Sequence, residues 1–239
     1  AATELKGYFP QLKEQVMAAG IDFLYQPLTP PFTWKQLIDW EYALASSYPD
    51  ALIAFCDTWD MLYMGSRREF EDVVGAQPLL FQSDKQCWPH PDKRQLYFFR
   101  QNLFGSGQDD MKSPWHYVNG TGPAGTGAAI AEAIEYGMEH FPITAENTGS
   151  DVYDIAKDND QRFYTDIYLS GRGVLDTGCR LSQSLVDVRP GELAVRGGRL
   201  YNKVTGSKPL FVHANGALAM MGHKTLMDIL SAYRPERPW

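Results

Sequence analysis

The sequence predicts an α/β fold in which helices flank a largely parallel sheet. Two observations support this prediction. Short, bulky apolar runs that are typical of buried strands recur along the chain, and segments with apolar residues at helical spacing separate them. The 239 residues show neither an internal repeat nor a linker, so we expect a single domain over residues 1–239.

The first third of the chain alternates between the two kinds of element. A glycine ends the first helical segment, and Thr33 and Ser66 are side chains that can cap the next two helices. The apolar run at 51–56 is typical of a strand buried on both faces. The elements expected here, in order, are a helix over 8–20, a strand over 23–28, a helix over 33–47, a strand over 51–56, a helix after residue 66 and a strand over 78–82.

The second part of the chain begins with an irregular segment. Residues 83–114 are polar and contain several prolines, a pattern typical of a long surface segment that carries function. The elements expected after it are a short strand at 117–118, a glycine-rich turn, a helix over 128–141, a helix from residue 158, strand-like runs over 173–186 and 193–204, a strand over 209–212 and a helix from residue 224.

Composition argues against several classes of protein. No apolar run reaches the length of about 18 residues that a membrane span requires. A net charge of −7 argues against a nucleic-acid partner. The three cysteines are odd in number and far apart, so they indicate neither a disulfide framework nor a recognisable zinc site.

Two carboxylates follow the apolar run at 51–56. Asp57 and Asp60 come directly after the predicted strand, with Trp59 between them and no basic residue beside them. Ligands bind outside the carboxyl ends of strands in open α/β sheets, and paired carboxylates suit a hard divalent cation. The alternative is a structural strand-end cap, because aspartate is common after strands.

His213 stands directly after the predicted strand at 209–212. Parallel strands bring their carboxyl ends to one edge of a sheet, so Asp57, Asp60 and His213 are expected to converge there. Two carboxylates and one imidazole suit Mn²⁺, which accepts mixed oxygen and nitrogen ligands. A strand-end histidine is also commonly a structural hydrogen-bonding residue, and the residues alone leave both interpretations open.

The glycine-rich run at 120–125 matches G-x-G-x-x-G and precedes a helix. A dinucleotide-binding fold needs a strong buried strand before this motif and an acidic residue at the end of the next strand. Only Tyr117 and Val118 precede the run as a strand, and residues 141–144 form a poor strand after the helix. We therefore expect no NAD(H) binding, and we interpret the run as a turn whose glycines let backbone approach a ligand.

Several motifs follow one another in an order and at a spacing that are more specific together than any one alone. They are Ala-Thr-Glu at 2–4, Asp-Thr-Trp-Asp at 57–60, Cys-Trp-Pro at 87–89 with Asp84 upstream, Tyr-Val-Asn and the glycines at 117–125, Asp-Asn-Asp-Gln-Arg-Phe-Tyr-Thr at 158–165, Leu-Asp at 175–176 with Gln183, Val-His-Ala-Asn-Gly at 212–216 and the ending at 233–239. Over nearly its whole length the chain resembles the glycosyltransferase domain of the procollagen lysyl hydroxylase, or procollagen glucosyltransferase, family. The family's hydroxylase part has no counterpart here, and the resemblance implies that the first strand is truncated.

The resemblance implies a GT-A-type fold, with a Rossmann-like, mostly parallel sheet flanked by helices. It implies a hexosyltransferase that uses Mn²⁺ and moves glucose or galactose from a UDP-sugar to a hydroxyl acceptor, such as a glycosylated hydroxylysine of collagen or another glycan, with retention of configuration. The alternative is a binding module of the same fold that holds a UDP-sugar or carbohydrate with little or no turnover. The expected compartment is the secretory pathway if the chain follows the family, and the cytoplasm if it is microbial or viral.

The resemblance also implies roles for individual residues. The metal ligands would be Asp57, Asp60 and His213. The nucleotide or its phosphates would contact Thr3, Lys35, Trp59, Asn215, Gly216 and Lys224, with Trp59 stacked on uracil. Asp84, Trp88 and Asn119 would shape the acceptor side, and Asp158, Asn159 and Asp160 would act in transfer.

Two positions depart from the family's pattern. Asn159 stands where the family has the central acid of an acidic run, so the rate or role of this segment would differ. Residues 217–222 intervene before Lys224, which would replace the family's phosphate-binding lysine. Whether the chain transfers sugar therefore depends on Asp160 and its neighbours.

Overall fold

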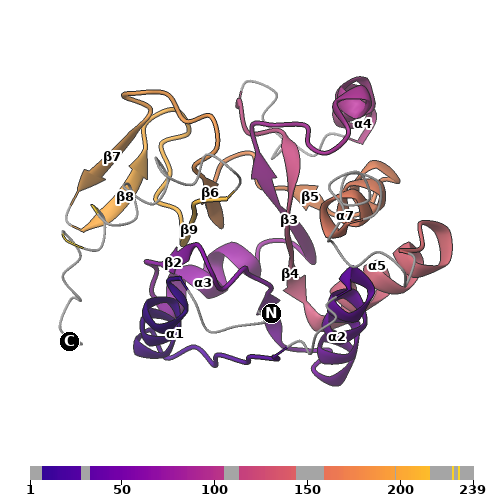
Figure 1. Cartoon of the computed structure of the whole chain (residues 1–239), viewed down its shortest axis with the longest axis horizontal. Helices are drawn as coiled ribbons and strands as arrows, with labels where there is room; N and C mark the ends of the chain where they lie inside the picture. The colour runs from indigo at the N-terminus through magenta and orange to yellow at the C-terminus, as the bar shows by residue number, and fades with distance from the viewer. Residues whose placement is uncertain are drawn as a thin grey trace.

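The predicted α/β fold is confirmed by the computed structural model, which describes residues 7–27, 33–104, 113–143, 159–196, 198–215, 228 and 231. The described strands form a four-stranded sheet, a three-stranded sheet and a two-stranded hairpin. Figure 1 shows the two larger sheets next to each other at the centre, with helices on both flanks and the hairpin to one side.

The four-stranded sheet is mixed rather than mostly parallel. Its strand order is β1 (Leu52–Ala54), β4 (Tyr117–Thr126), β3 (Leu79–Asp84) and β5 (Val174–Leu175). β4 runs antiparallel to both of its neighbours, whereas β3 and β5 are parallel. The expectation of a largely parallel sheet is therefore wrong for the described strands, because one long central strand runs against the others.

The strand β4 contains the glycine-rich run for which the sequence predicted a turn. Gly125 has a φ of 148°, and a Cβ there would lie 2.0 Å from the carbonyl oxygen of Pro78. Gly122 has a φ of 102°, and its Cβ would lie 2.7 Å from the Cβ of Phe55. Only glycine combines this backbone freedom with such close approach. The glycines therefore bring β4 close to neighbouring segments of the protein.

The helices alternate with these strands along the chain. In the described ranges they are α1 (Phe9–Ala18), α2 (Trp34–Ser47), α3 (Arg67–Val74), α4 (Arg94–Phe104), α5 (Gly127–His140) and α7 (Asp160–Leu169), with a 3-10 turn over Pro91–Lys93. Thr33 and Ser66 form capping boxes at the starts of α2 and α3, which confirms both predicted caps. None of these described helices has the length and apolar content that crossing a membrane requires.

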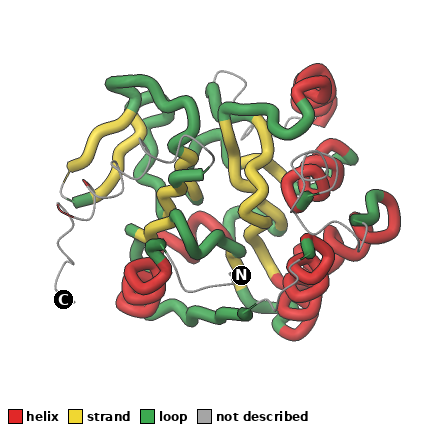
Figure 2. Tube along the Cα trace, viewed as in Figure 1, coloured by secondary structure: helices red, strands yellow, loops and turns green. Residues whose placement is uncertain are grey.

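Two hydrophobic cores lie on opposite sides of β3. Successive side chains of a strand point to opposite faces, so Leu79 and Phe81 pack with α2, α5 and α7, while Leu80 packs with α1 and α3. Figure 2 shows α2, α5 and α7 along one flank of the four-stranded sheet. The edge strand β1 is only half-buried, so its expected burial on both faces is wrong.

The three-stranded sheet has the order β2 (Met61–Tyr63), β9 (Phe211–His213) and β6 (Ser182–Ser184). β9 is antiparallel to β2 and parallel to β6. Beside it, β7 (Leu193–Arg196) and β8 (Arg199–Asn202) form the antiparallel hairpin. Because β2 pairs with β9, this smaller sheet brings the loop before β2 next to the end of β9. The residues of the candidate site lie in that loop and at that strand end.

Two further expectations about secondary structure differ from the structure, and a third falls almost entirely outside the described residues. Residues 23–26 form no strand, although the sequence predicted one over 23–28. The segment 83–114, expected to be irregular, contains α4, which the sequence did not reveal because several of its large apolar side chains face solvent: Leu96, Phe98, Phe99 and Leu103. The helix expected from residue 224 lies outside the described residues, apart from 228 and 231.

Candidate metal centre

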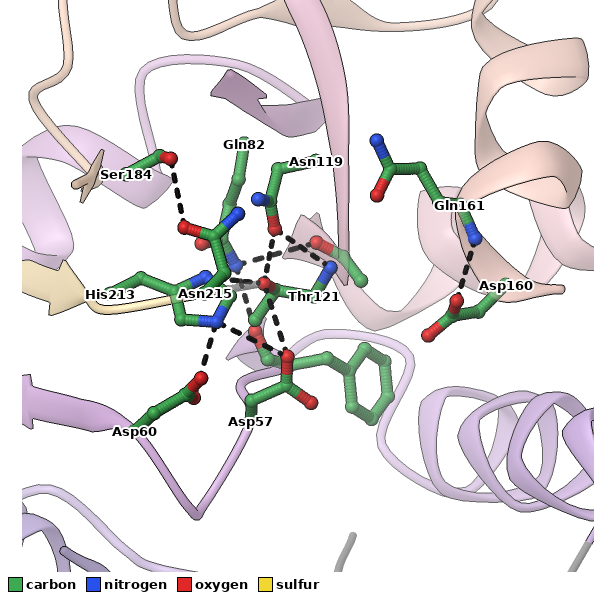
Figure 3. A network of polar contacts seen from close by, with 12 residues as sticks. Asp57, Asp60, Gln82, Asn119, Thr121, Asp160, Gln161, Ser184, His213 and Asn215 are labelled. Atoms are coloured by element: carbon green, nitrogen blue, oxygen red, sulfur yellow. Dashed lines mark hydrogen bonds and ion pairs between the residues drawn. The ribbon is translucent and has the colours of Figure 1, made fainter. Parts of the chain in front are cut away.

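Asp57, Asp60 and His213 converge, as the sequence predicted. One ligand atom from each side chain lies within 4.8 Å of the others. Nε2 of His213 is 3.2 Å from Oδ1 of Asp60 and 3.5 Å from Oδ2 of Asp57. Figure 3 shows both carboxylates directed toward the same edge of the imidazole ring. This donor set of two carboxylates and one imidazole is a candidate metal centre.

Antiparallel pairing in the small sheet brings these residues together, and not the parallel strand ends on which the prediction was based. Met61 of β2 lies opposite His213 of β9, and Asp60 directly precedes Met61. The carbonyl oxygen of Asp60 accepts a hydrogen bond from the backbone N–H of Ala214 at 2.9 Å. This register brings Asp60, at the start of β2, to the end of β9 where His213 stands.

The loop that carries both carboxylates is held by hydrogen bonds to its backbone. Nε2 of Gln82, on β3, donates to the carbonyl oxygen of Phe55 at 3.0 Å. The backbone N–H of Tyr8 donates to the carbonyl oxygen of Trp59 at 2.7 Å. Because these bonds involve backbone oxygens of the loop, both carboxylates are left to face the imidazole.

The charged groups of the cluster shift one another's pKa values. Burial alone would lower the pKa of His213, but the charges of Asp60 and Asp57 outweigh burial and raise this pKa. The surrounding protein displaces water from part of the Asp57 carboxyl and so raises its pKa, and the charge of Asp60 adds to the rise. The Asp57 side chain keeps 46% of its surface exposed, so this ligand position stays open to solution. Adjacent carboxylates removed from water are costly unless a positive charge compensates them.

A network of polar side chains lies behind the imidazole. Asp84, at the end of β3, is 3% exposed, and its Oδ2 accepts hydrogen bonds from Nδ2 of Asn119 at 3.1 Å and from Nδ2 of Asn215 at 2.8 Å. Oδ1 of Asn215 accepts in turn from the Ser184 hydroxyl at 2.9 Å. Asp84 and Asn119 were predicted for the acceptor and Asn215 for the nucleotide. The structure places all three in one network, and their ligand contacts remain predictions.

Asp160 lies on the other side of Asp57, at the start of α7 (Figure 3). Burial raises the pKa of Asp160 well above its usual range, and the charges of Asp57 and Glu41 add to the rise. Asn159 is fully buried as the N-cap of α7, where its Oδ1 accepts from the backbone N–H of Arg162 at 2.7 Å. The geometry thus gives Asn159 a capping role, and it directs Asp160 toward the candidate centre.

Two half-exposed tryptophans belong to the predicted site. Trp59, between the two carboxylates, and Trp88 are each 47% exposed. Nε2 of Gln161, next to Asp160, donates to the carbonyl oxygen of Trp88 at 2.6 Å. The Trp88 segment is therefore attached beside Asp160, whereas Trp59 is part of the metal-ligand loop.

The remaining predicted site residues are separate from this cluster or lie outside the described residues. Lys35 is paired with Asp39, one turn further along α2, at 2.6 Å, and both side chains are about half exposed. Its nucleotide contact remains a prediction. Thr3, Asp158, Gly216 and Lys224 lie outside the described residues.

A cleft of about 930 Å³ lies beside the loop. Its walls come from β1, from α1, α2 and α3 and from the segment after α1, and Cys56 and Thr58 bring it to the metal-ligand loop. β1 pairs with β4 on one side, and residues 51–56 line the cleft. The candidate centre therefore has a large concave surface next to it.

The sequence did not reveal two residues of the site, Thr121 and Glu41. Oγ1 of Thr121 is 3.0 Å from Nδ1 of His213; had the run 120–125 been read as a strand, the two-residue period would have placed it on the same face as Asn119. Glu41 is 3% exposed, accepts a hydrogen bond from the Tyr164 hydroxyl and has a pKa raised to about 8 by burial. Its place on the apolar face of α2 was the available signal.

Comparison with known proteins identifies a relative in sequence but no protein family. No protein-family model matches the chain. The chain is 25% identical over 187 residues to the uncharacterized protein R699 of Acanthamoeba polyphaga mimivirus, an alignment that covers 76% of this chain and 35% of R699. The chain thus spans about a third of the length of this curated relative.

Proposed function

We propose that this protein is a Mn²⁺-dependent hexosyltransferase of GT-A-type fold that transfers glucose or galactose from a UDP-sugar to a hydroxyl acceptor. The observation that carries the proposal is the convergence of Asp57, Asp60 and His213 beside a cleft. The resemblance of the sequence motifs to the procollagen glucosyltransferases supplies the classes of donor and acceptor. A central sheet with helices on both flanks supports the fold assignment.

The residues present fit a divalent ion of intermediate hardness. Asp57 and Asp60 offer carboxylate oxygens, His213 offers an imidazole nitrogen, and Mn²⁺ accepts this mixture. When bound, the ion would act as a Lewis acid toward the diphosphate of the leaving UDP. Asp60 and His213 stand at the ends of two paired strands of the small sheet, and Asp57 stands in the loop that leads into β2, so the sheet would support the ion on one side.

The residues around the cluster divide into a nucleotide side and a sugar side. The exposed ring of Trp59 provides an aromatic surface for stacking on uracil. On the opposite side, Asp160 would orient the acceptor hydroxyl or stabilise positive charge at the anomeric carbon. Trp88, attached to the start of α7 through Gln161, offers an aromatic face to the acceptor sugar.

Calorimetric titration with UDP tests the site assignment. The wild-type protein should bind UDP much more tightly with Mn²⁺ than without it, and Asp57→Ala should lose this dependence. Asp72→Ala is the matched control, because Asp72 is an exposed aspartate on α3 and its side chain is 65% exposed. Metal-independent binding of UDP, or an Asp57→Ala variant that behaves like the wild type, would contradict the proposal.

The alternative is a binding module that holds the UDP-sugar without transferring it. It is favoured by Asn159, which stands at the position of a family acid and whose side chain is committed to the helix cap. Incubation with UDP-glucose or UDP-galactose and a galactosyl-hydroxylysine acceptor separates the two functions. Release of UDP that depends on Mn²⁺ and on the acceptor supports the transferase, whereas binding without release supports the module.

A further inference from the structure

We infer that Thr121 is a positioning residue that accepts a hydrogen bond from Nδ1 of His213 and so holds the ring with Nε2 toward the metal site. This inference rests on the proposed metal centre and adds to it Thr121, to which no sequence motif assigned a role. The observation is a continuous chain of hydrogen bonds that runs from Asp84 through Asn119 and Thr121 to the imidazole. Figure 3 shows the part of the chain from Asn119 to His213.

The first part of the chain fixes the orientation of the Asn119 amide. Nδ2 of Asn119 donates to the Asp84 carboxylate at 3.1 Å, and Oδ1 of Asn119 accepts from the backbone N–H of Thr121 at 3.1 Å. Turning the amide over would point its NH₂ group at a backbone N–H and its oxygen at a carboxylate. Asn119 therefore presents an acceptor oxygen to the Thr121 hydroxyl.

The hydroxyl of Thr121 has a single hydrogen to donate. Its oxygen is in close contact with Oδ1 of Asn119, which can only accept, whereas Oδ2 of Asp57 is 3.5 Å away. Donation to Asn119 leaves the oxygen of Thr121 with its lone pairs for Nδ1 of His213, at 3.0 Å. Nδ1 must therefore carry the hydrogen, because a bare Nδ1 would set two acceptors against each other.

With Nδ1–H donated to Thr121, Nε2 is the ring nitrogen that is left to bind a metal ion in place of its own hydrogen. That nitrogen is the one that faces Asp60 and Asp57, at 3.2 and 3.5 Å. All three members of the chain are buried: Asp84 is 3% exposed, Asn119 3% and Thr121 5%, so water is largely kept from replacing their bonds. Outer residues that orient a histidine ligand typically change metal affinity by about 10- to 100-fold.

The test uses variants that remove or keep the hydroxyl. Thr121→Val removes it at nearly constant volume, Thr121→Ala removes it without the branched side chain, and Thr121→Ser retains it. Thr165→Val is the matched control, because Thr165 is a buried threonine whose hydroxyl contacts the Tyr97 hydroxyl at 3.1 Å, away from the site. One readout is the ¹H–¹⁵N signal of the Nδ1–H group of His213 and its exchange with water in metal-free protein, and the other is the Mn²⁺ dissociation constant from calorimetry.

We expect the wild type, Thr121→Ser and Thr165→Val to show an Nδ1–H signal that exchanges slowly with water. Thr121→Val and Thr121→Ala should lose the slow exchange and bind Mn²⁺ about 10- to 100-fold more weakly. The inference is overturned if the hydroxyl-free variants keep the slow exchange, or if Thr121→Ser behaves like Thr121→Val. A wild-type protein that binds no Mn²⁺ would overturn the proposed function instead, and the Nδ1–H signal would still decide the role of Thr121.

Discussion

Asp57 with Asp60 forms one acidic region, and Glu41 forms a second. The two regions differ in how the negative charge of their carboxyl groups is compensated. In the first region, Asp57 and Asp60 face the imidazole of His213 at 3.5 and 3.2 Å. In the second, Glu41 is buried against the hydroxyl of Tyr164, and burial raises its pKa to about 8. The first region is arranged for a cation, whereas the second holds a carboxyl that keeps its proton at neutral pH.

The difference shows that acidic residues near the same cleft can have different roles. Asp57 is open enough to reach a ligand, since 46% of its side chain is exposed, but only 3% of Glu41 is exposed. A hydrogen-bonded neutral carboxyl is the less costly form in a buried position. The first region therefore contributes to ligand binding, while the second contributes to the packing of α2 against α7. Variants that affect one region and spare the other test this division.

Removal of the imidazole should have the largest effect. His213→Ala leaves two carboxylates without the nitrogen ligand, so Mn²⁺ binding and turnover should both be lost. At free Mn²⁺ about 1,000 times its dissociation constant, the wild type should gain about 4 kcal/mol of unfolding free energy and the variant almost none. Denaturant unfolding with and without Mn²⁺ measures this gain. His140→Ala, at an exposed histidine on α5, should keep it, and a full gain in His213→Ala would refute the metal centre.

Replacement of the Asp160 carboxyl group by an amide should have the next largest effect, and it should act on rate alone. Asp160→Asn keeps the shape of the side chain at the start of α7, so Mn²⁺ affinity should stay within about twofold. Turnover should fall about 100-fold, the usual cost of removing a group that stabilises charge in the transition state. UDP release measures the rate, with Asp72→Asn as the control for charge. A parallel loss of metal affinity would show that the two sides of Asp57 act as one site.

The buried carboxyl of Glu41 should appear in the pH dependence of stability. Its pKa is near 4.5 when exposed and about 8 in the fold, so the folded protein binds more protons than the unfolded chain between these values. Stability therefore falls as pH rises from 4.5 to 8, by at most about 1.4 kcal/mol per unit from this residue. Glu41→Gln should make the slope shallower in urea unfolding across this window. Glu71→Gln, at an exposed glutamate of α3, should leave it unchanged.

Sequence reasoning succeeded where local chemistry determines structure. Thr33 and Ser66 were recognised as caps because a capping box needs only side chains three residues apart. The convergence of Asp57 and His213 was also predicted, although from parallel strand ends, whereas the antiparallel register of β2 and β9 produces it. Strand pairing depends on distant partners, so the sequence alone left this register unspecified.

The sequence predicted a turn where β4 forms a strand, and this is why Thr121 was not predicted as a site residue. The glycines of β4 have weak strand propensity, and they are accommodated because Pro78 and Phe55 lie too close for side chains at Gly125 and Gly122. A close packing of this kind is a property of the assembled fold and leaves no local periodicity. Thr121 sits within this run, so its place behind His213 could be found only once β4 was recognised as a strand.

Substitutions of Asn159 should have the smallest effect. They distinguish a role in capping α7 from a role in catalysis. Oδ1 of Asn159 accepts from the backbone N–H of Arg162 while the side chain is fully buried. Asn159→Ala should lower the unfolding free energy by about 1 kcal/mol, the usual cost of losing an N-cap, whereas Asn159→Asp should stay within a few tenths because aspartate caps equally well. If capping is its role, Asn159→Asp should also leave the rate of UDP release unchanged. A clear increase in turnover would instead mean that an acid at this position acts in transfer. The protein would then be a transferase whose rate is lowered because Asn159 replaces that acid.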